Sequence, residues 1–290
     1  MIGKLRDLIV HKFKSLLGVY QLRDEIRRLS EISIQSLLAN ELNNDPRYQD
    51  KKRLTRYEFQ VNSQGGEDGI IQEIFRRIGT TNKFFVEFGA GNGLENNTSC
   101  LLLNKWKGCW MECSERHADA IRDGYAGLIA DKSLVFKETL INAEDIEPLF
   151  TELGVPAEFD LLSIDIDGND YWVWKAIENY RPRVVIIEYN AYMGPQAEWT
   201  IRYDRDFSKG QDRYWGASLK LLEKLGREKG YALVGCSYIG VNAFFVREDL
   251  LKSDFAEPFT AENHYEPQKP YLIRNSNYPK SFKELSRPGV

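Results

Sequence analysis

The chain has 290 residues, of which 42% are hydrophobic and 28% charged, so it is long enough to bury a full core. Its formal net charge of -4 provides no overall basic field, and we expect no nucleic-acid partner. The four cysteines lack the paired spacing of a zinc site, and no secretory signal precedes the predicted fold, which indicates a reduced, cytoplasmic setting.

Residues 1–45 carry apolar side chains at helical spacing between charged ones. The pattern predicts an amphipathic helical arm that ends at the breaker Asn43-Asn44-Asp45-Pro46. We expect the arm to pack on its own domain or to pair with a second subunit, which predicts a homo-oligomer. The basic first half of the arm leaves open a peripheral contact with the inner face of a membrane, although no apolar run is long enough to span one.

From residue 46 to about residue 250, apolar β-type runs alternate with helical stretches, which is typical of a mostly parallel sheet covered on both faces. The pattern predicts a Rossmann-like, doubly wound α/β domain of seven strands. Only residues 235–240 separate the last two strands, so the final strand is expected to be antiparallel to its neighbour. Residues 251–290 are expected to be a C-terminal extension and a candidate lid. The expected strands are 84–88, 108–111, 134–136, 159–166, 184–189, 231–234 and 243–246, and the expected helices include 69–77, 98–105, 143–153, 171–178 and 218–229.

The first predicted strand runs into a turn with three glycines, Gly89, Gly91 and Gly93, within the stretch "FFVEFGAGNGLENNT". A glycine-rich first turn lets the backbone approach a ligand at the carboxyl ends of the strands, which predicts a nucleotide-like ligand. The dinucleotide fingerprint needs its third glycine where Leu94 stands, and this disfavours NAD. Glu87 at the strand end would repel a pyrophosphate but attract a ligand that carries an ammonium group.

This acid and glycine spacing resembles the first motif of class I methyltransferases that depend on S-adenosylmethionine (SAM). The resemblance implies that Glu87 binds the methionine ammonium and that the glycine turn and Asn97 contact the cofactor. Glu112 ends the second strand, where an acidic side chain accepts bonds from the ribose hydroxyls. Asn142 and Ala143 follow the third strand and are expected at the adenine edge; plain helix capping by Asn142 is the alternative.

The fourth strand leads into "FDLLSIDIDGNDYWVW", which places three acids within six residues. Strand alternation predicts that Ser163, Asp165 and Asp167 point to one side, while Asp170 is expected to be an ordinary charge at a helix N-terminus. Burying such acids together is costly unless a proton, a cation or the SAM sulfonium joins them. We therefore expect Asp165 and Asp167 to be functional, with Asp165 also contacting the cofactor.

The stretch "SIDIDGNDYWVWKAI" resembles the motif after strand four in the FkbM-like branch of the methyltransferases, over a domain of residues 65–250. Many members methylate sugar hydroxyls, so the resemblance implies an O-methyltransferase that acts on a sugar of a nucleotide-linked precursor or a surface polysaccharide. The alternatives are an N-methyltransferase on a small molecule or peptide, a non-catalytic scaffold that keeps the fold, and an oxidoreductase that uses NAD or a nucleotide sugar.

The fifth strand ends near Glu188 and Asn190. Several related O-methyltransferases hold magnesium with an acid after strand four and an acid or amide after strand five. The resemblance thus implies Asp165, Asp167, Glu188 and Asn190 as ligands of Mg²⁺, whose preferred ligands are oxygen atoms. FkbM-like enzymes need not bind metal, and without it Glu188 bonds a sugar hydroxyl or pairs with an arginine.

Methyl transfer to a hydroxyl needs a group that accepts the proton. Asp167 or Asp165 is the first candidate for this base, and His264 in a polar, aromatic segment is the second. The long charged and aromatic segment 197–218 has the composition of an ordered binding loop for the acceptor.

Overall fold

The computed structural model describes residues 12, 18–269 and 272 of the chain. Its contacts divide the chain into two compact units, Met1–Gln49 and Asp50–Val290. The first unit contains α2 (Val19–Asn44), which begins directly after Gly18, and α3 (Pro46–Gln49). The helix α2 is the described part of the predicted arm; residues 1–11 and 13–17 of that arm lie outside the described residues.

Several apolar side chains of α2 are exposed. Leu22, Ile26, Leu29 and Ile32 are each more than half exposed, at 58%, 56%, 63% and 65%. Among the described residues, no helix has the length and apolar character needed to cross a bilayer.

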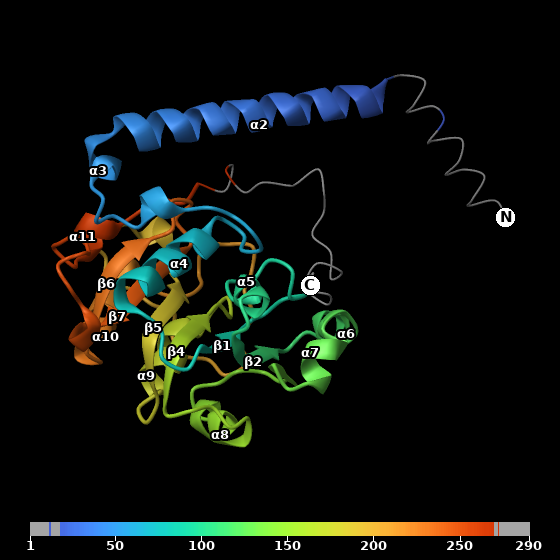
Figure 1. Cartoon of the computed structure of the whole chain (residues 1–290), viewed down its shortest axis with the longest axis vertical. Helices are drawn as coiled ribbons and strands as arrows, with labels where there is room; N and C mark the ends of the chain where they lie inside the picture. Colours follow the sequence, from blue (N-terminus) through green and yellow to red (C-terminus); the bar gives the residue numbers. More distant parts are fainter. Residues whose placement is uncertain (1–11, 13–17, 270–271, 273–290) are drawn as a thin grey trace. The chain divides into compact units, whose positions relative to one another are not determined.

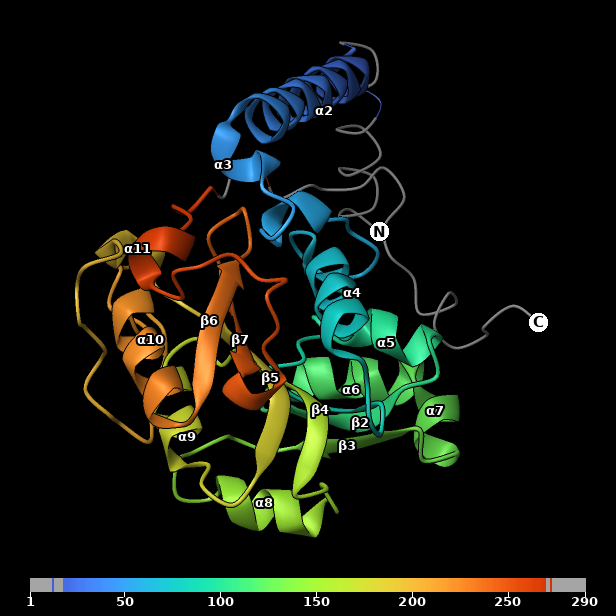
Figure 2. The same ribbon diagram turned by 60° about the vertical axis from the view of Figure 1, so that its left-hand side comes forward.

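The second unit is built on a seven-stranded sheet in the order β3-β2-β1-β4-β5-β7-β6 (Figure 1, Figure 2). Neighbouring strands from β3 to β5 are parallel, and β7 is antiparallel to both β5 and β6. The strand order reverses between β1 and β4, where ligands bind in open α/β sheets. The predicted fold class is confirmed. The strands are β1 (Phe84–Phe88), β2 (Lys107–Glu112), β3 (Leu134–Glu138), β4 (Glu158–Ile164), β5 (Arg181–Glu188), β6 (Tyr231–Cys236) and β7 (Asn242–Arg247).

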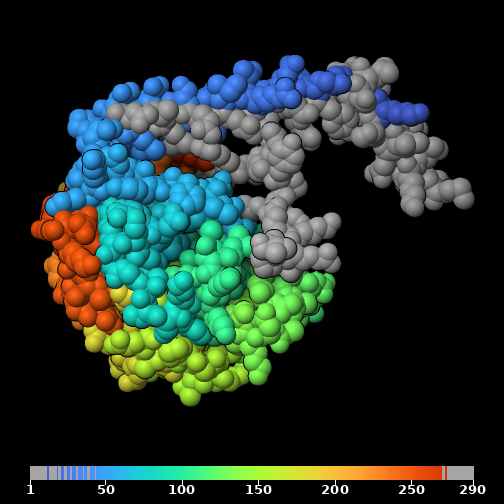
Figure 3. All heavy atoms as spheres, in the orientation of Figure 1, coloured from blue at the N-terminus to red at the C-terminus, as the bar shows by residue number. Residues whose placement is uncertain are grey.

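Helices cover both faces of this sheet. Successive side chains along a strand point to opposite faces, and the strands are apolar on both, so each face needs a cover. One face packs against α4 (Glu67–Ile78), α5 (Ser99–Leu103), α6 (Glu115–Gly124) and α7 (Ala126–Ala130). In the space-filling view, atoms of α4 lie over the middle of the second unit (Figure 3). The other face packs against α8 (Ile146–Glu152), α9 (Asp170–Ala176) and α10 (Leu219–Glu228). The short helices are η1 (Thr55–Tyr57), η2 (Ala191–Met193), η3 (Glu248–Leu250) and α11 (Ala261–His264).

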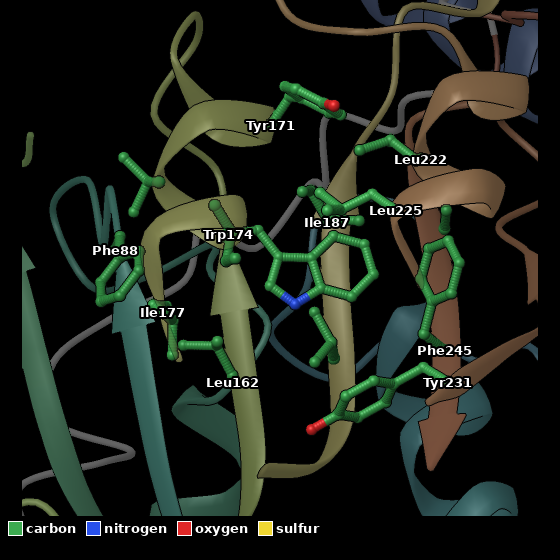
Figure 4. Close-up of a cluster of buried hydrophobic side chains, with 14 of the residues drawn as sticks. Phe88, Leu162, Tyr171, Trp174, Ile177, Ile187, Leu222, Leu225, Tyr231 and Phe245 are labelled. Carbon is green, nitrogen blue, oxygen red and sulfur yellow. The ribbon is translucent and has the colours of Figure 1, made fainter. Parts of the chain in front are cut away.

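Trp174 of α9 lies at the centre of the second of these faces (Figure 4). Its side chain is 1% exposed, and its ring lies 4.9 Å from that of Phe245 and 6.1 Å from that of Tyr231, between ring centroids. Burial of a ring of this size contributes several kcal/mol to folding. The packing fixes α9, and with α9 the turn that follows β4.

An ion pair joins β4 and β5 at the end of the sheet opposite that turn. Asp160 is fully buried and lies 2.7 Å from Nη1 of Arg183, which is 6% exposed. Asp160 also accepts hydrogen bonds from the backbone N–H groups of Thr81 and Lys83. The carboxylate therefore ties the segment before β1 to the central strands β4 and β5.

We expect Asp160→Asn to lower the free energy of unfolding by about 3 kcal/mol, because it leaves the buried Arg183 guanidinium without its counter-charge. Urea unfolding of the variant checks this value. Asp249→Asn, which changes a more exposed partner of Arg247, is the matched control and should cost less than about 1 kcal/mol. Equal losses in the two variants would contradict the stabilising role assigned to the buried ion pair between Asp160 and Arg183.

Candidate functional site

The turn after β1 is shaped by its three glycines. Gly89, Gly91 and Gly93 all have positive φ angles of 67°, 55° and 80°, a conformation that glycine adopts without strain. Gly89 has a second constraint, because a Cβ atom there would lie 1.7 Å from the backbone oxygen of Asp165. The turn after β1 and the end of β4 therefore meet at backbone contact.

Glu87, at the end of β1, holds the segment that follows the glycines. Its side chain is nearly fully buried, and its carboxylate accepts hydrogen bonds from the backbone N–H groups of Asn97 (2.9 Å) and Thr98 (3.2 Å). The side chains of Asn96 (2.6 Å), Thr98 (2.5 Å) and Ser163 (3.1 Å) also donate to it. Burial raises the pKa of Glu87, and these donors oppose that rise. The predicted direct contact with a ligand ammonium has to compete with these donors.

The end of β4 differs from the prediction in one respect. The strand ends at Ile164, so strand alternation does not continue to residue 167. Asp165 follows in an irregular segment, and Asp167 has a φ of 60°, in the left-handed region. A non-glycine residue in this region is strained, and such strain is commonly retained at functional sites. The carboxylates of Asp165 and Asp167 still converge as predicted, but the turn after β4, and not strand alternation, brings them together.

Asp170 fixes the shape of that turn. It is fully buried, begins α9 as predicted, and accepts hydrogen bonds from the backbone N–H groups of Ile166 (2.9 Å) and Gly168 (2.8 Å). Its role in this structure is to order the residues between β4 and α9, and so to position Asp165 and Asp167.

Two cavities adjoin at the carboxyl ends of β1 and β4, and Gly89, Gly91, His117 and Asp165 line both. The first has a volume of about 270 Å³ and a polar wall that includes Asn97. The second has a volume of about 340 Å³ and a larger apolar share, and it extends toward the ends of β2 and β3. The two cavities together offer one polar and one mixed compartment on either side of Asp165.

Glu112 is the last residue of β2, as predicted, and lies in the wall of the second cavity. Its two carboxylate oxygens accept hydrogen bonds from the backbone N–H groups of Gly91 and Ser114, each at 2.8 Å. A carboxylate oxygen can accept more than one bond, so both oxygens keep capacity for a ligand hydroxyl.

The wall of the second cavity next to the end of β3 is formed by residues that precede the predicted Asn142 and Ala143. Thr139, Leu140 and Ile141 line the second cavity, whereas Asn142 and Ala143 line neither of the two. Asn142 is 2% exposed, and with its amide nitrogen assigned to the side that faces acceptors, the side chain donates to the backbone oxygen of Arg205 at 3.1 Å. Leu140 is 50% exposed and lines the second cavity, where it provides an apolar surface for a flat ligand. The apolar pair Leu140-Ile141, four residues after the predicted strand 134–136, was the signal available in the sequence.

Three carboxylates, one of them that of Asp165, gather where β4 and β5 end. One ligand atom from each of Asp165, Asp167 and Glu188 lies within 4.8 Å of the others. The ammonium group of Lys209 also lies among them: it is hydrogen-bonded to Asp167 and 3.8 Å from Oε1 of Glu188. The other oxygen of Glu188, Oε2, is buried and has no hydrogen-bond partner among the described residues. The predicted acids are therefore brought together, with a cation that the sequence did not indicate.

The charges of this cluster perturb one another. Desolvation, followed by the nearby carboxylates of Asp170 and Asp167, raises the pKa of Asp165 well above its usual range. Desolvation and the Asp165 carboxylate do the same to the pKa of Glu188. Desolvation opposes the charge of Lys209, but Glu188 and Asp167 outweigh it and raise the pKa of the ammonium group. Lys209 therefore stays charged at neutral pH.

The raised pKa of Glu188 predicts a pH dependence of stability. Between the usual carboxyl value, 4.5, and its raised value, Glu188 binds a proton in the folded state but not in the unfolded state. The contribution of Glu188 to stability is therefore fully present below pH 4.5 and falls as pH rises toward its raised pKa, by at most about 1.4 kcal/mol per pH unit. Glu188→Gln should make this decline shallower. Urea unfolding at several pH values checks it, and identical slopes for both proteins would contradict it.

The remaining two predicted residues lie elsewhere. The side chain of Asn190 accepts a bond from the backbone of Tyr192 and donates to the backbone oxygens of Arg213 and Trp215. Its amide is thus used to anchor the loop, and not to complete the carboxylate cluster. His264 is 3% exposed, within α11, and lines neither of the two cavities.

The predicted acceptor loop, residues 197–218, is held down from several sides. Asn169 donates to the backbone oxygen of Asp204 (2.7 Å), and Trp172 donates to that of Ile201 (3.0 Å). Arg205, which the sequence offered as a ligand-binding residue of this loop, lines the second cavity together with Phe207, which the sequence did not single out.

No protein-family model matches the chain, and no curated protein matches it. Several solved structures do. They include a candidate O-methyltransferase of Klebsiella pneumoniae (16% identity over 76% of this chain and 97% of that one, TM-score 0.43) and a SAM-dependent methyltransferase of Clostridium acetobutylicum (12%, 74%, 98% and 0.39). A third is the glycopeptide N-methyltransferase MtfA with SAM (13%, 65%, 96% and 0.39). At these identities and TM-scores the likeness does not identify a reaction or substrate, and the function proposed below rests on the site.

Proposed function

We propose that the chain is a SAM-dependent methyltransferase. The observation that carries this proposal is the pair of cavities that adjoin at Gly89 and Asp165. SAM has a polar amino-acid end and a nucleoside end, joined by a sulfonium. The polar cavity with Asn97 suits the first, and the mixed cavity with Glu112 and Leu140 suits the second. The sulfonium would then lie near Asp165, whose carboxylate favours a positive charge.

The roles of the wall residues follow from this placement. Glu112 would accept bonds from the ribose hydroxyls, and Leu140 with Phe207 would contact the adenine. Glu87 would act mainly through Asn97 and the turn it holds, and less through direct contact with the ammonium group.

We further propose O-methylation of a sugar hydroxyl, as the FkbM-like resemblance implies. SAM would supply the methyl group: the acceptor oxygen would bond to the methyl carbon as the carbon–sulfur bond breaks, and S-adenosylhomocysteine would be the leaving thioether. Asp167 or Asp165 takes the hydroxyl proton, and the raised pKa of Asp165 suits that residue to the task. The aromatic loop above the acids supports a sugar acceptor, since aromatic rings stack on the apolar faces of sugars. His264 is the weaker candidate for the base, because it lines neither cavity.

The Mg²⁺ ion implied by some relatives of this fold does not fit the described residues well. The three carboxylates are suitable ligands. However, Lys209 places its ammonium group among them, and Asn190 is committed to the loop. In the proposed reaction, therefore, no step depends on a metal ion.

Transfer of labelled methyl from SAM to a panel of acceptors tests the proposal. We expect label in nucleotide sugars or glycans. Asp167→Asn should lose turnover but not SAM binding, whereas Asp165→Asn should lose turnover and also bind SAM more weakly, because Asp165 lines both cavities. Label in peptides or amines would favour N-methylation. SAM binding without turnover on any acceptor would favour the scaffold alternative.

We also propose that the protein is cytoplasmic. We further propose that the arm of residues 1–45 pairs with a second copy, because α2 exposes the apolar side chains of Leu22, Ile26 and Leu29. Sedimentation of the full chain over a range of concentrations tests this pairing. A monomer at every concentration would contradict it and leave peripheral membrane contact as the alternative, to be examined with anionic vesicles.

A further inference from the structure

Lys209 is a counter-ion for the carboxylates of Asp167 and Glu188, and its ammonium group is held by these acids and by the ring of Trp215. Its ammonium group contacts Asp167, lies 3.8 Å from Oε1 of Glu188, and lies 4.1 Å from the centre of the Trp215 ring. A cation over the face of an indole ring is stabilised by the ring's electrons. The side chain is only 31% exposed, so two acids and an aromatic face enclose much of it.

The loop that carries Lys209 is anchored at the ends of the two strands that provide the acids. Asn190, directly after β5, holds the backbone oxygens of Arg213 (2.9 Å) and Trp215 (2.9 Å). Asn169, after β4, holds the backbone oxygen of Asp204 (2.7 Å). Trp215 itself is 5% exposed. These anchors lie on both sides of residue 209 in the sequence, so the loop delivers the ammonium group to the acids in a defined place.

We propose that Lys209 is the built-in cation of this site and takes the place that a divalent metal ion would need. A metal ion would bind the same carboxylate oxygens that Lys209 contacts, and two cations in contact repel each other strongly in a partly buried site. Lys209 and a divalent ion are therefore mutually exclusive. The wild-type protein needs no metal, and removal of the ammonium group leaves three converging carboxylates that bind one.

Lys209 is a positioning residue in this account. It keeps Asp167 and Glu188 at a fixed separation and offsets part of their charge, so that a neutral acceptor and the SAM sulfonium meet a defined arrangement of acids. The cation-binding part of the inference holds for the folded chain whatever its substrate. Only the activity measurement below rests on the proposed function.

Calorimetric titration of the full chain with Mn²⁺ tests the proposal. The proteins compared are wild type, Lys209→Met, Lys209→Arg and the double variant K209M/D167N. Lys224→Met is the matched control, because Lys224 pairs with Glu198 at a more exposed position. Circular dichroism melting establishes that each variant is folded. We expect Lys209→Met to bind Mn²⁺ at least about tenfold more tightly than wild type, Lys209→Arg and Lys224→Met to behave as wild type, and K209M/D167N to lose the gain.

Two results would overturn the proposal: wild type that binds Mn²⁺ as tightly as Lys209→Met, or a folded Lys209→Met that shows no gain. If Lys209→Met does not fold, Lys209→Gln is titrated in its place, and saturable binding by wild type alone still contradicts the proposal. Once an acceptor is known, EDTA should leave wild-type turnover unchanged. If no acceptor is found, the proposed function fails, but the titrations still decide the role of Lys209.

Discussion

Gly89→Ala is expected to abolish SAM binding and to lower the free energy of unfolding by about 3 kcal/mol or more. The added methyl group would lie 1.7 Å from the backbone oxygen of Asp165, and the residue would also have to keep a φ of 67°. Neither strand end can move away easily, because β1 and β4 are paired along their length. Relief of the clash would therefore open the junction of the two cavities. Urea unfolding and calorimetry with SAM measure the two effects.

Gly91→Ala separates the clash from the backbone conformation. Gly91 lies in the same turn with a φ of 55°, but nothing lies within 4 Å of the position of an added Cβ atom. The variant should lose only about 1–2 kcal/mol, the usual cost of a left-handed conformation for a residue with a side chain. If the two variants lose the same stability, the backbone contact between Gly89 and Asp165 is not what fixes the turn.

Glu87→Ala should lower both stability and SAM affinity. The substitution leaves the buried backbone N–H groups of Asn97 and Thr98 without their acceptor, together with side-chain donors. Each unsatisfied buried group costs about 1–3 kcal/mol, so we expect a loss of about 4 kcal/mol in the free energy of unfolding. SAM affinity falls as a consequence, because the turn that forms the cavity wall loses its order.

The measurement for Glu87→Ala is urea unfolding without ligand, followed by calorimetry with SAM. Glu87→Gln should show a smaller loss, since one acceptor oxygen remains. Unchanged stability with abolished SAM binding would contradict the structural role and would support Glu87 as a direct ligand of the ammonium group. Glu115→Ala, at an acid in the first turn of α6, is the control and should change neither quantity by more than about 0.5 kcal/mol.

The core of the fold was predictable because its strands are continuous apolar runs. Val86, Leu162 and Val185 lie in such runs, and the sheet buries both faces of each strand. The short link between β6 and β7 fixed the antiparallel end. The helices α6 and α7 were not among the predicted helices, because their buried positions are few and small: Ala118, Ile121 and Gly124 are the buried residues of α6, and none are buried in α7.

The candidate site was predictable where a strand end determines it. Glu87, Glu112 and Asp165 each lie at a strand end or one residue from it, and each lines a cavity. The position of Leu140 depends on where β3 ends, at Glu138, and such boundaries are poorly marked in sequence. Lys209 was not predictable, because its contacts with Asp167 and Glu188 arise from the path of a long loop.

Calorimetric titration of the purified chain with SAM, S-adenosylhomocysteine and NAD tests the central claim most directly. The account predicts saturable binding of SAM and S-adenosylhomocysteine at one site per chain, a loss of that binding in Gly89→Ala, and no binding of NAD. Binding of NAD or a nucleotide sugar, with none of SAM or S-adenosylhomocysteine, would contradict it and would show that the glycine turn and its two cavities hold another ligand.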